Sequence, residues 1–334
     1  SSTEAAMQTL YELIVDKKLW LDNTVVIIDP CVNPDGRDRY VNWYNQVKAS
    51  PYDTNQNATE HNEPWPSGRP NHYLFDLNRD WVWASQVETK QRLKLYNQWM
   101  PHIHVDFHEQ GINEPYYFAP AAEPFHEVIS DWQRKFQLQI GKNHAKYFDR
   151  EGWLFFTRER FDLLYPSYGD TYPTFMGAIG MTYEQAGHGR AGLGIDNDEG
   201  IKLTLVDRIK HHTTTSLSTV EISSQNAKKL NEEFSQYFKN DQLKYKSYVL
   251  NGNIDHKKKL TNLLNLHDIK WGYSVNNSIS GFRYKIQKKG SIDAKNAIIV
   301  STDQPKGKMV KTLFEPDTKL SNPLTYDITS WSLP

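Results

Sequence analysis

The sequence lacks the features that mark several large classes of protein. Its 334 residues contain a single cysteine, Cys31, which excludes an internal disulfide framework. No apolar run approaches the roughly 18 residues that a membrane-spanning helix needs, so we predict no transmembrane segment. The formal net charge of −1 gives no basis for predicting nucleic-acid binding. The length of the chain suits one large domain, or one large domain and a small one.

The charges are distributed unevenly along the chain. From residue 241 onward there are 15 Lys and Arg against 8 Asp and Glu, whereas residues 1–240 carry 24 and 32. We therefore predict two parts, a large domain over residues 1–240 and a small basic α/β domain over residues 241–334. The opposite charges are expected to lie on solvated faces, and mutual attraction of the two parts is the alternative.

The spacing of apolar residues predicts alternating helices and strands. A helix is expected to start at Ser1, because Ser1 and Glu4 have the spacing of a capping box. Further helices are expected over residues 85–99, 125–148 and 199–238, and strands over residues 24–28, 103–108 and 178–184. A tight turn is expected at residues 29–36. This order predicts an α/β fold with a mixed, largely parallel central sheet and helices on both faces.

Three segments place polar groups where such folds carry out chemistry. The alternating run from Ile103 ends at His108, and a second apolar run ends at Glu184. In open α/β sheets, active sites lie at the carboxyl ends of strands. A third segment contains the pair Asn78-Arg79 between aromatic residues. A metal ligand, a carboxylate that activates water and an arginine for an anionic substrate are the parts of a zinc hydrolase.

Four motifs occur in an order that resembles the zinc carboxypeptidases of metallopeptidase family M14. They are "NPDG" at Asn33–Gly36, "DLNRDW" at Asp76–Trp81, "VDFHEQG" at Val105–Gly111 and "GMTYEQAG" at Gly180–Gly187. The resemblance covers roughly residues 1–240. It implies one catalytic Zn²⁺, with His108 as the third zinc ligand and Glu184 as the general base. It also implies that Asn78 and Arg79 bind the terminal carboxylate of the substrate.

The same resemblance leaves several roles open. Tyr165 best matches the family's mobile tyrosine over the substrate, and Tyr168 is the competitor. The arginine that polarises the scissile carbonyl stays unassigned between Arg37 and Arg39. Asp80 stands where the family has Asn, a change that we expect to be harmless.

The paired zinc ligands His-x-x-Glu are missing from the sequence. In the family this pair precedes the first helix, so it would fall immediately before Ser1. We therefore expect the natural protein to be longer than this 38.9 kDa chain. His61-Asn62-Glu63 has the wrong spacing and is rejected as a substitute.

The sequence thus predicts a zinc-dependent metallocarboxypeptidase that removes C-terminal residues from peptides. Peptide or protein C-termini are the expected partners, and a further protein partner is left open. One alternative is a related deacylase or cell-wall peptide hydrolase, and another is a non-catalytic binding or scaffold protein with a peptidase fold. The resemblance alone predicts an extracytoplasmic location, that is, periplasmic, cell-surface or secreted.

Overall fold

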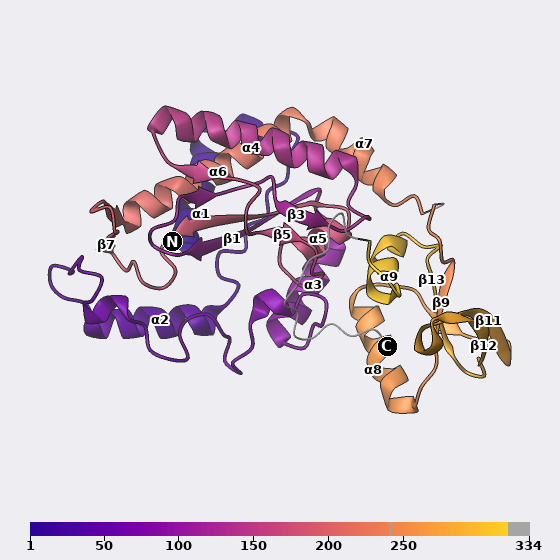
Figure 1. Cartoon of the computed structure of the whole chain (residues 1–334). Helices are drawn as coiled ribbons and strands as arrows, with labels where there is room; N and C mark the ends of the chain where they lie inside the picture. Colours follow the sequence, from indigo (N-terminus) through magenta and orange to yellow (C-terminus); the bar gives the residue numbers. More distant parts are fainter. Residues whose placement is uncertain (241, 320–334) are drawn as a thin grey trace.

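The computed structural model describes residues 1–240 and 242–319 of the chain (Figure 1). The α-helices are α1 Ser2–Val15, α2 Pro34–Val47, α3 Val87–Trp99, α4 Asp131–Glu151, α5 Thr171–Phe175, α6 Leu205–Gln225, α7 Ala227–Tyr237, α8 Ile254–Leu266 and α9 Gly307–Phe314. The strands are β1 Ile103–Gln110, β2 Tyr116–Tyr117, β3 Ala122–Phe125, β4 Phe155–Phe156, β5 Asp162–Leu163, β6 Ile179–Ala186, β7 Gly194–Asp196, β8 Lys202–Thr204, β9 Ser247–Leu250, β10 Gly272–Tyr273, β11 Ser278–Arg283, β12 Lys288–Asp293 and β13 Ile298–Ser301. Short 3₁₀ turns lie at η1 Lys18–Leu21, η2 Thr59–His61, η3 Leu77–Arg79 and η4 Tyr284–Ile286.

A four-stranded sheet forms the centre of the fold, in the order β1-β6-β2-β4. β1 runs parallel to β6, and β2 runs parallel to β4. β2 and β6 are antiparallel where Tyr117 faces Glu184. All eight residues of β6 are buried, as expected for an inner strand. The predicted mixed, largely parallel α/β sheet is therefore confirmed.

The two faces of the sheet are covered by different elements. Ile103, Val105 and Phe107 of β1 pack into an apolar cluster with residues of β6 and α4. The ring of His104 faces the other way, with its centroid 5.4 Å from that of Trp81 and 6.0 Å from that of Tyr96 in α3. Figure 1 shows α4 and α6 above the sheet and α3 below it. This alternation directs the even-numbered side chains of β1 toward the segment that carries Asn78 and Arg79.

The prediction of a strand over residues 24–28 is wrong. These residues belong to none of the described strands, and Val25 and Ile27 are 71% and 49% exposed. Val26 and Ile28 instead line a groove together with Leu10 of α1. A buried parallel strand needs a neighbouring strand, and β1, the first strand of the sheet, pairs only with β6 among the described residues.

Three local predictions also need correction. The segment predicted as a tight turn is the start of α2, because the Asn33 side chain accepts a hydrogen bond from the Gly36 backbone N–H (3.0 Å). The helix predicted from residue 125 begins at Asp131, where Ser130 and Gln133 form a capping box. The capping box at Ser1 does not form, since the Glu4 carboxylate pairs with Arg37 instead (2.8 Å).

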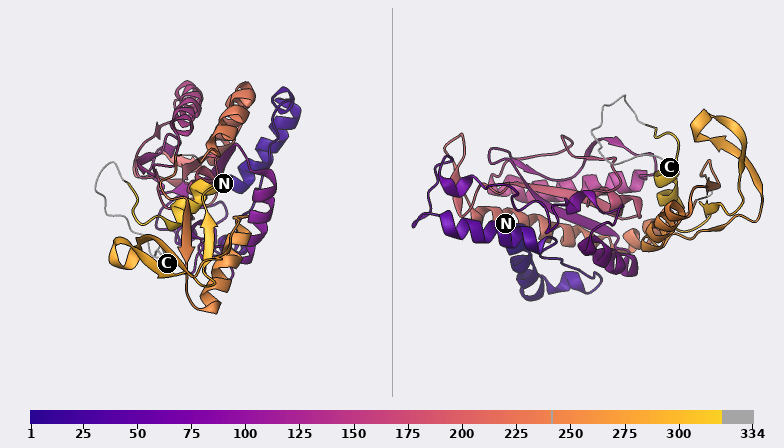
Figure 2. Two further views of the ribbon diagram at one scale, coloured as in Figure 1. Left: turned by 90° about the vertical axis from the view of Figure 1, so that its right-hand side faces the viewer. Right: turned by 90° about the horizontal axis from the view of Figure 1, so that it is seen from below.

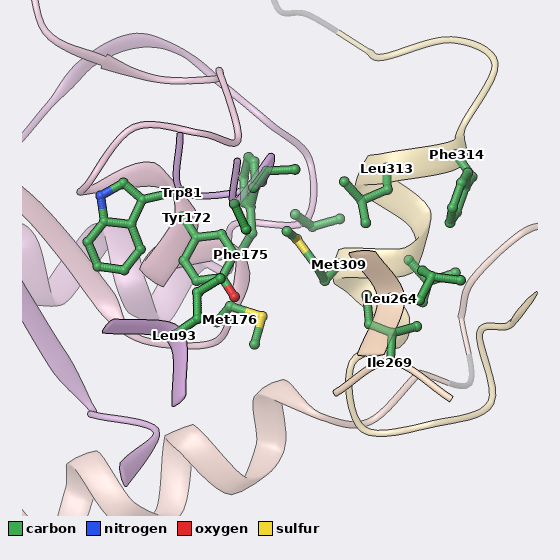
Figure 3. Packing of buried hydrophobic residues seen from close by; sticks show 14 of the residues in the cluster. Trp81, Leu93, Tyr172, Phe175, Met176, Leu264, Ile269, Met309, Leu313 and Phe314 are labelled. Carbon is green, nitrogen blue, oxygen red and sulfur yellow. The ribbon is translucent and has the colours of Figure 1, made fainter. Parts of the chain in front are cut away.

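Residues 242–319 form a small α/β lobe at one end of the molecule (Figure 2). Residues 320–334 of the predicted second domain lie outside the described residues. The antiparallel sheet of the lobe has the order β10-β13-β9, and β11 and β12 form a separate hairpin. The boundary between the two predicted domains stays a prediction, because one apolar cluster is continuous across it. Figure 3 shows the members of this cluster from both parts: Trp81, Leu93, Tyr172, Phe175, Met176, Leu264, Ile269, Met309, Leu313 and Phe314.

This shared core predicts that the lobe and the large domain unfold together. Leu264 is fully buried in the cluster, so Leu264→Ala is expected to lower the free energy of unfolding by about 2–5 kcal/mol. Denaturant unfolding followed by tryptophan fluorescence and circular dichroism should give one transition, shifted as a whole. Val275→Ala, at a position 97% exposed, is the control and should change little. Two transitions, with only one of them shifted, would contradict a shared core.

In the part of the chain that the structure describes, no helix combines the length and the apolar character needed to cross a membrane.

Candidate active site

The predicted site lies at the carboxyl ends of the adjacent parallel strands β1 and β6. His108 and Glu184 are direct partners in the register of these strands, so their side chains project from the same face of the sheet. Both side chains are largely buried. Thr182 and Asp106, each two residues earlier on its strand, project from that face as well. The structure therefore brings together the predicted metal ligand and the predicted base.

His108 is oriented by the carboxylate two residues before it. Its Nε2 lies 2.7 Å from Oδ2 of Asp106. A carboxylate can only accept, so Nε2 carries the hydrogen. Nδ1 makes no hydrogen bond to any described residue, which leaves it available as a ligand atom. A histidine that donates one ring N–H to a carboxylate has the arrangement common among metal-binding histidines.

The charges around His108 hold a proton on the ring. Burial alone would lower the pKa of this imidazole, but the charge and hydrogen bond of Asp106 and the charge of Glu184 outweigh burial and raise the pKa to about 9. The reverse holds for Asp106, where burial raises the pKa and the stronger attraction of His108 lowers it below its usual value. A metal ion at His108 would have to displace this proton.

Glu184 titrates in the neutral range. Its burial, together with the negative charges of Asp106 and Asp170, raises the pKa to about 7, against the opposing attraction of His108. Burial and the charge of Asp106 also raise the pKa of Asp170, to about 6. Asp170 accepts a hydrogen bond from the Thr182 hydroxyl (2.9 Å). Glu184 thus has the pKa expected of a general base that works near pH 7.

The "DLNRDW" segment is fixed by its own carboxylates. The Asp76 side chain accepts a hydrogen bond from the Asn78 backbone N–H (2.8 Å) and starts the turn η3. Asp80 accepts from the backbone N–H groups of Ser85 and Gln86 (2.8 and 2.9 Å) and connects the segment to α3. The family's asparagine could not supply this pair of charged acceptors, so Asp80 has a structural task here.

Asn78 lies directly against His108. Its Oδ1 accepts a hydrogen bond from the Gly169 backbone N–H (2.6 Å), and its Nδ2 lies 3.0 Å from Nε2 of His108. The single in-plane position of that ring nitrogen is taken by Asp106, so the Asn78 amide keeps its N–H donors for another acceptor. Gly169 is required at this point, since a Cβ there would lie 2.1 Å from Oδ2 of Asp106.

Arg79 and the two candidate tyrosines occupy different environments. The Arg79 side chain is 48% exposed, and its guanidinium lies 4.3 Å from the centre of the Tyr168 ring. Tyr165 is 3% exposed, and its hydroxyl accepts a hydrogen bond from the Trp83 indole N–H (2.8 Å). Tyr168 is therefore the tyrosine that shares the exposed surface with Arg79, whereas Tyr165 packs below it.

The two arginines considered for carbonyl polarisation have other partners. Arg37 pairs with Glu4 on α1, and Arg39 donates to the backbone carbonyls of Ser67 and Pro70. Arg69 is instead the arginine whose charge lowers the pKa of both His108 and Glu184, although burial and acidic neighbours dominate there. Its guanidinium donates two hydrogen bonds to Asp76 (3.0 and 3.1 Å).

The described residues do not fit a catalytic zinc by themselves. Such a site normally has three protein ligands. Within residues 1–240 and 242–319, no three His, Cys, Asp or Glu side chains are grouped so that they could hold a metal ion. His108 is present and suitably oriented, but it is one ligand of three.

Comparison with known families decides the membership of the chain. The model of the family described as zinc carboxypeptidase, Peptidase_M14, matches residues 1–182. The chain belongs to the zinc carboxypeptidase family. No curated protein and no solved structure matched the chain. The family match includes Asn78, Arg79, His108 and Tyr165, and it ends two residues before Glu184.

Three polar residues of the site were not singled out from the sequence. Asp106 had a usable signal, because a period of two places it on the face of β1 that carries His108. Asp170 and Arg69 had none, since both lie in irregular segments whose position relative to the sheet is set by long-range packing.

Proposed function

We propose that this zinc carboxypeptidase family member is a metallocarboxypeptidase that hydrolyses the C-terminal residue of peptides. The observation that supports it best is the pairing of His108 and Glu184 on adjacent parallel strands, with Asn78 in contact with His108. The residues proposed as general base, metal ligand and carboxylate-binding asparagine thereby lie on one side of the sheet. Asn78, His108 and Glu184 are far apart in the sequence. An accidental meeting of these residue types is therefore a poor explanation of their arrangement in the fold.

Glu184 is the proposed general base. With a pKa of about 7 its carboxylate is partly ionised at neutral pH and can take a proton from the attacking water. The water oxygen then bonds to the scissile carbonyl carbon. When the C–N bond breaks, the same proton passes from Glu184 to the leaving amine. The enzyme ends the cycle with Glu184 ionised again.

Asn78 and Arg79 are the proposed carboxylate-binding residues. Arg79 presents its guanidinium at the surface beside Tyr168, and Asn78 keeps amide N–H donors beside His108. A guanidinium can bind a carboxylate through two parallel charge-assisted hydrogen bonds. We assign the substrate-facing tyrosine to Tyr168 rather than Tyr165, because the Tyr165 hydroxyl is buried against Trp83.

The family depends on zinc, and His108 is the one described residue that we propose as a zinc ligand. Nδ1 of His108 is the proposed ligand atom, held in place by the bond from Nε2 to Asp106. The remaining ligands are not among the described residues.

Arg79→Ala tests the proposal through the end group of the substrate. We expect it to weaken binding and turnover of peptides with a free C-terminal carboxylate by about 1.5–3 kcal/mol, that is, roughly 10–150-fold. The same peptides with an amidated C-terminus should be affected little. Calorimetry and steady-state kinetics on matched acid and amide peptides would measure this. Arg158→Ala, at a surface arginine outside the site, is the matched control. Equal losses on acid and amide would remove Arg79 from the carboxylate site.

A second candidate function is a binding protein that uses the same site without hydrolysis. It rests on the contacts of Asn78 with His108 and of Arg79 with Tyr168, because holding a free C-terminus needs no metal-bound water. Both candidates predict the same Arg79-dependent preference for free C-termini. They differ in turnover, since the binding protein would release the peptide uncut in the presence of zinc.

A further inference from the structure

The C-terminal lobe contacts the segment that carries Asn78 and Arg79 through a buried histidine, His267. His267 follows α8 and has no exposed surface. Its Nε2 lies 2.6 Å from the Val82 backbone oxygen, and its Nδ1 lies 2.9 Å from the Tyr172 hydroxyl. The carbonyl can only accept, so Nε2 carries the hydrogen and Nδ1 accepts from the tyrosine. One neutral imidazole thus connects two segments of the large domain.

Each of these segments leads directly to the candidate site. Val82 follows the "DLNRDW" segment, and its backbone N–H donates to the Ser167 hydroxyl (2.9 Å). Ser167 in turn donates to the backbone carbonyl of Arg79 (2.9 Å). Through Val82 and Ser167, three successive hydrogen bonds therefore connect His267 to the main chain of Arg79, a proposed carboxylate-binding residue.

Tyr172 makes the second connection. It is the second residue of α5, which follows the loop containing Gly169, and the Gly169 N–H donates to the side chain of Asn78. The Tyr172 ring stacks on Trp81 with the centroids 5.4 Å apart. The two segments are thus joined at Ser167–Arg79, at Gly169–Asn78 and at Trp81–Tyr172. His267 of the C-terminal lobe adds one hydrogen bond to each segment, at Val82 and at Tyr172.

The surroundings keep His267 neutral and immobile. Burial, together with the nearby Lys306 charge, lowers its pKa to about 4, so that the ring keeps one donor and one acceptor at neutral pH. Lys306 donates to the His267 backbone oxygen (2.7 Å) and to Asn97 of α3 (2.8 Å). The Asn97 amide donates back to the Leu266 carbonyl (2.9 Å). The turn that carries His267 is therefore fixed to the large domain from both sides.

We propose that His267 is a positioning residue through which the C-terminal lobe holds Asn78 and Arg79 in the geometry that binds a substrate carboxylate. The part of this inference that concerns the carboxylate rests on the proposed function. The structural part, that the lobe fixes these two segments, does not depend on it. The lobe thereby has a task in substrate binding although none of its residues is proposed to touch the substrate.

The test compares variants of His267 with a matched variant elsewhere in the same interface. His267→Leu removes both hydrogen bonds and keeps most of the volume. His267→Gln restores one donor and one acceptor. His126→Gln is the control, because His126 bonds Glu315 at the end of α9 (2.6 Å). Its ring packs on Phe175 at the far end of α5, with the centroids 5.2 Å apart, but it bonds no residue of 76–82 or 165–172. Tyr172→Phe is a milder variant, since it keeps the ring on Trp81 and removes only the hydroxyl.

Hydrogen exchange of the backbone amides gives the first measurement and needs no substrate. In His267→Leu, residues 76–82 and 165–172 are expected to exchange about tenfold faster than in the wild type, whereas His267→Gln and His126→Gln should keep the wild-type rates there. Tyr172→Phe should accelerate the second segment. If His267→Leu does not fold, the Tyr172→Phe variant is the test. Wild-type exchange rates at residues 165–172 in that variant would then overturn the inference. Equal acceleration by His267→Leu and His126→Gln would also overturn it.

The ratio of affinities for matched acid and amide peptides gives the second measurement. His267→Leu should lower this ratio about tenfold through weaker binding of the acid, and His267→Gln should restore it. A lowered ratio with a normal His126→Gln supports the inference, and an unchanged ratio overturns its functional part. If the wild type itself does not prefer the acid, the proposed function fails, and the exchange measurement still decides whether His267 positions the two segments.

Discussion

Glu184→Gln is expected to lower peptide turnover by about 10²–10⁴-fold, the usual contribution of a positioned general base. Gln is close to Glu in shape but cannot take a proton from water. Glu184 lies on an inner strand, fully paired in the register of β1 and β6, so the backbone has no reason to move. Peptide affinity should stay near the wild-type value. Single-turnover kinetics together with binding measurements would separate the two quantities.

Glu60→Gln is the matched control for this substitution. Glu60 is also buried, and its carboxylate accepts from the Tyr44 hydroxyl (3.1 Å) and the Ala49 N–H (2.6 Å), away from β1 and β6. An amide at this position can cost stability but should leave turnover unchanged. Near-normal turnover in Glu184→Gln would mean that another group is the base.

Mild acid is expected to lower the stability of the protein through a histidine that is buried in its neutral form. Burial lowers the pKa of His144 from 6.5 to about 3. Between these two values the unfolded chain binds a proton at His144 that the folded protein does not bind, so stability is lost as the pH falls below 6.5. At pH 5 this one residue should cost about 2 kcal/mol relative to pH 8.

Other titratable groups also contribute to the pH dependence of stability, some in the same direction as His144 and some in the opposite direction. Burial lowers the pKa of five further histidines, namely His102, His104, His211, His212 and His267. The raised pKa values of Glu184 and Asp170 act in the opposite sense, because these folded carboxyls gain protons before the unfolded ones do. A single-residue comparison therefore tests the effect better than the acid midpoint of the wild type.

His144→Phe provides that comparison. The ring of His144 packs between Phe118 and Tyr183, and Phe keeps this packing while removing the titration. The loss of unfolding free energy between pH 8 and pH 5, measured in urea, should be about 2 kcal/mol smaller in the variant. His256→Phe, at an exposed histidine, should leave that loss unchanged. The same pH dependence in His144→Phe and the wild type would show that His144 is not held neutral.

Regular patterns in the sequence predicted the parts of the fold that depend on local periodicity. The alternation around His108 predicted β1, and the apolar run before Glu184 predicted β6, although each strand continues two residues beyond its predicted end. Residues 24–28 show the limit of this reasoning, because an apolar run has the same pattern whether or not a neighbouring strand covers it. The extracytoplasmic location stays a prediction.

The parts of the site that sequence patterns did not predict depend on contacts between distant segments. Arg69 lies in a long loop without periodicity, and its proximity to Glu184 follows from how that loop packs. His267 is 185 residues from Val82, and no local pattern links them. The order of motifs predicted Asn78 and Arg79, but their support from the C-terminal lobe is visible only in three dimensions.

The exposed run at residues 24–28 bears on the colloidal behaviour of the purified protein. Val25 and Ile27 project into water beside the apolar face of α1, where Met7, Tyr11 and Ile14 are also more than half exposed. Chains that expose adjoining apolar side chains attract one another through the hydrophobic effect. Association of this kind depends on the square of protein concentration and strengthens with salts that favour apolar burial. Dilute solutions with little kosmotropic salt are therefore the conditions in which this chain stays dispersed.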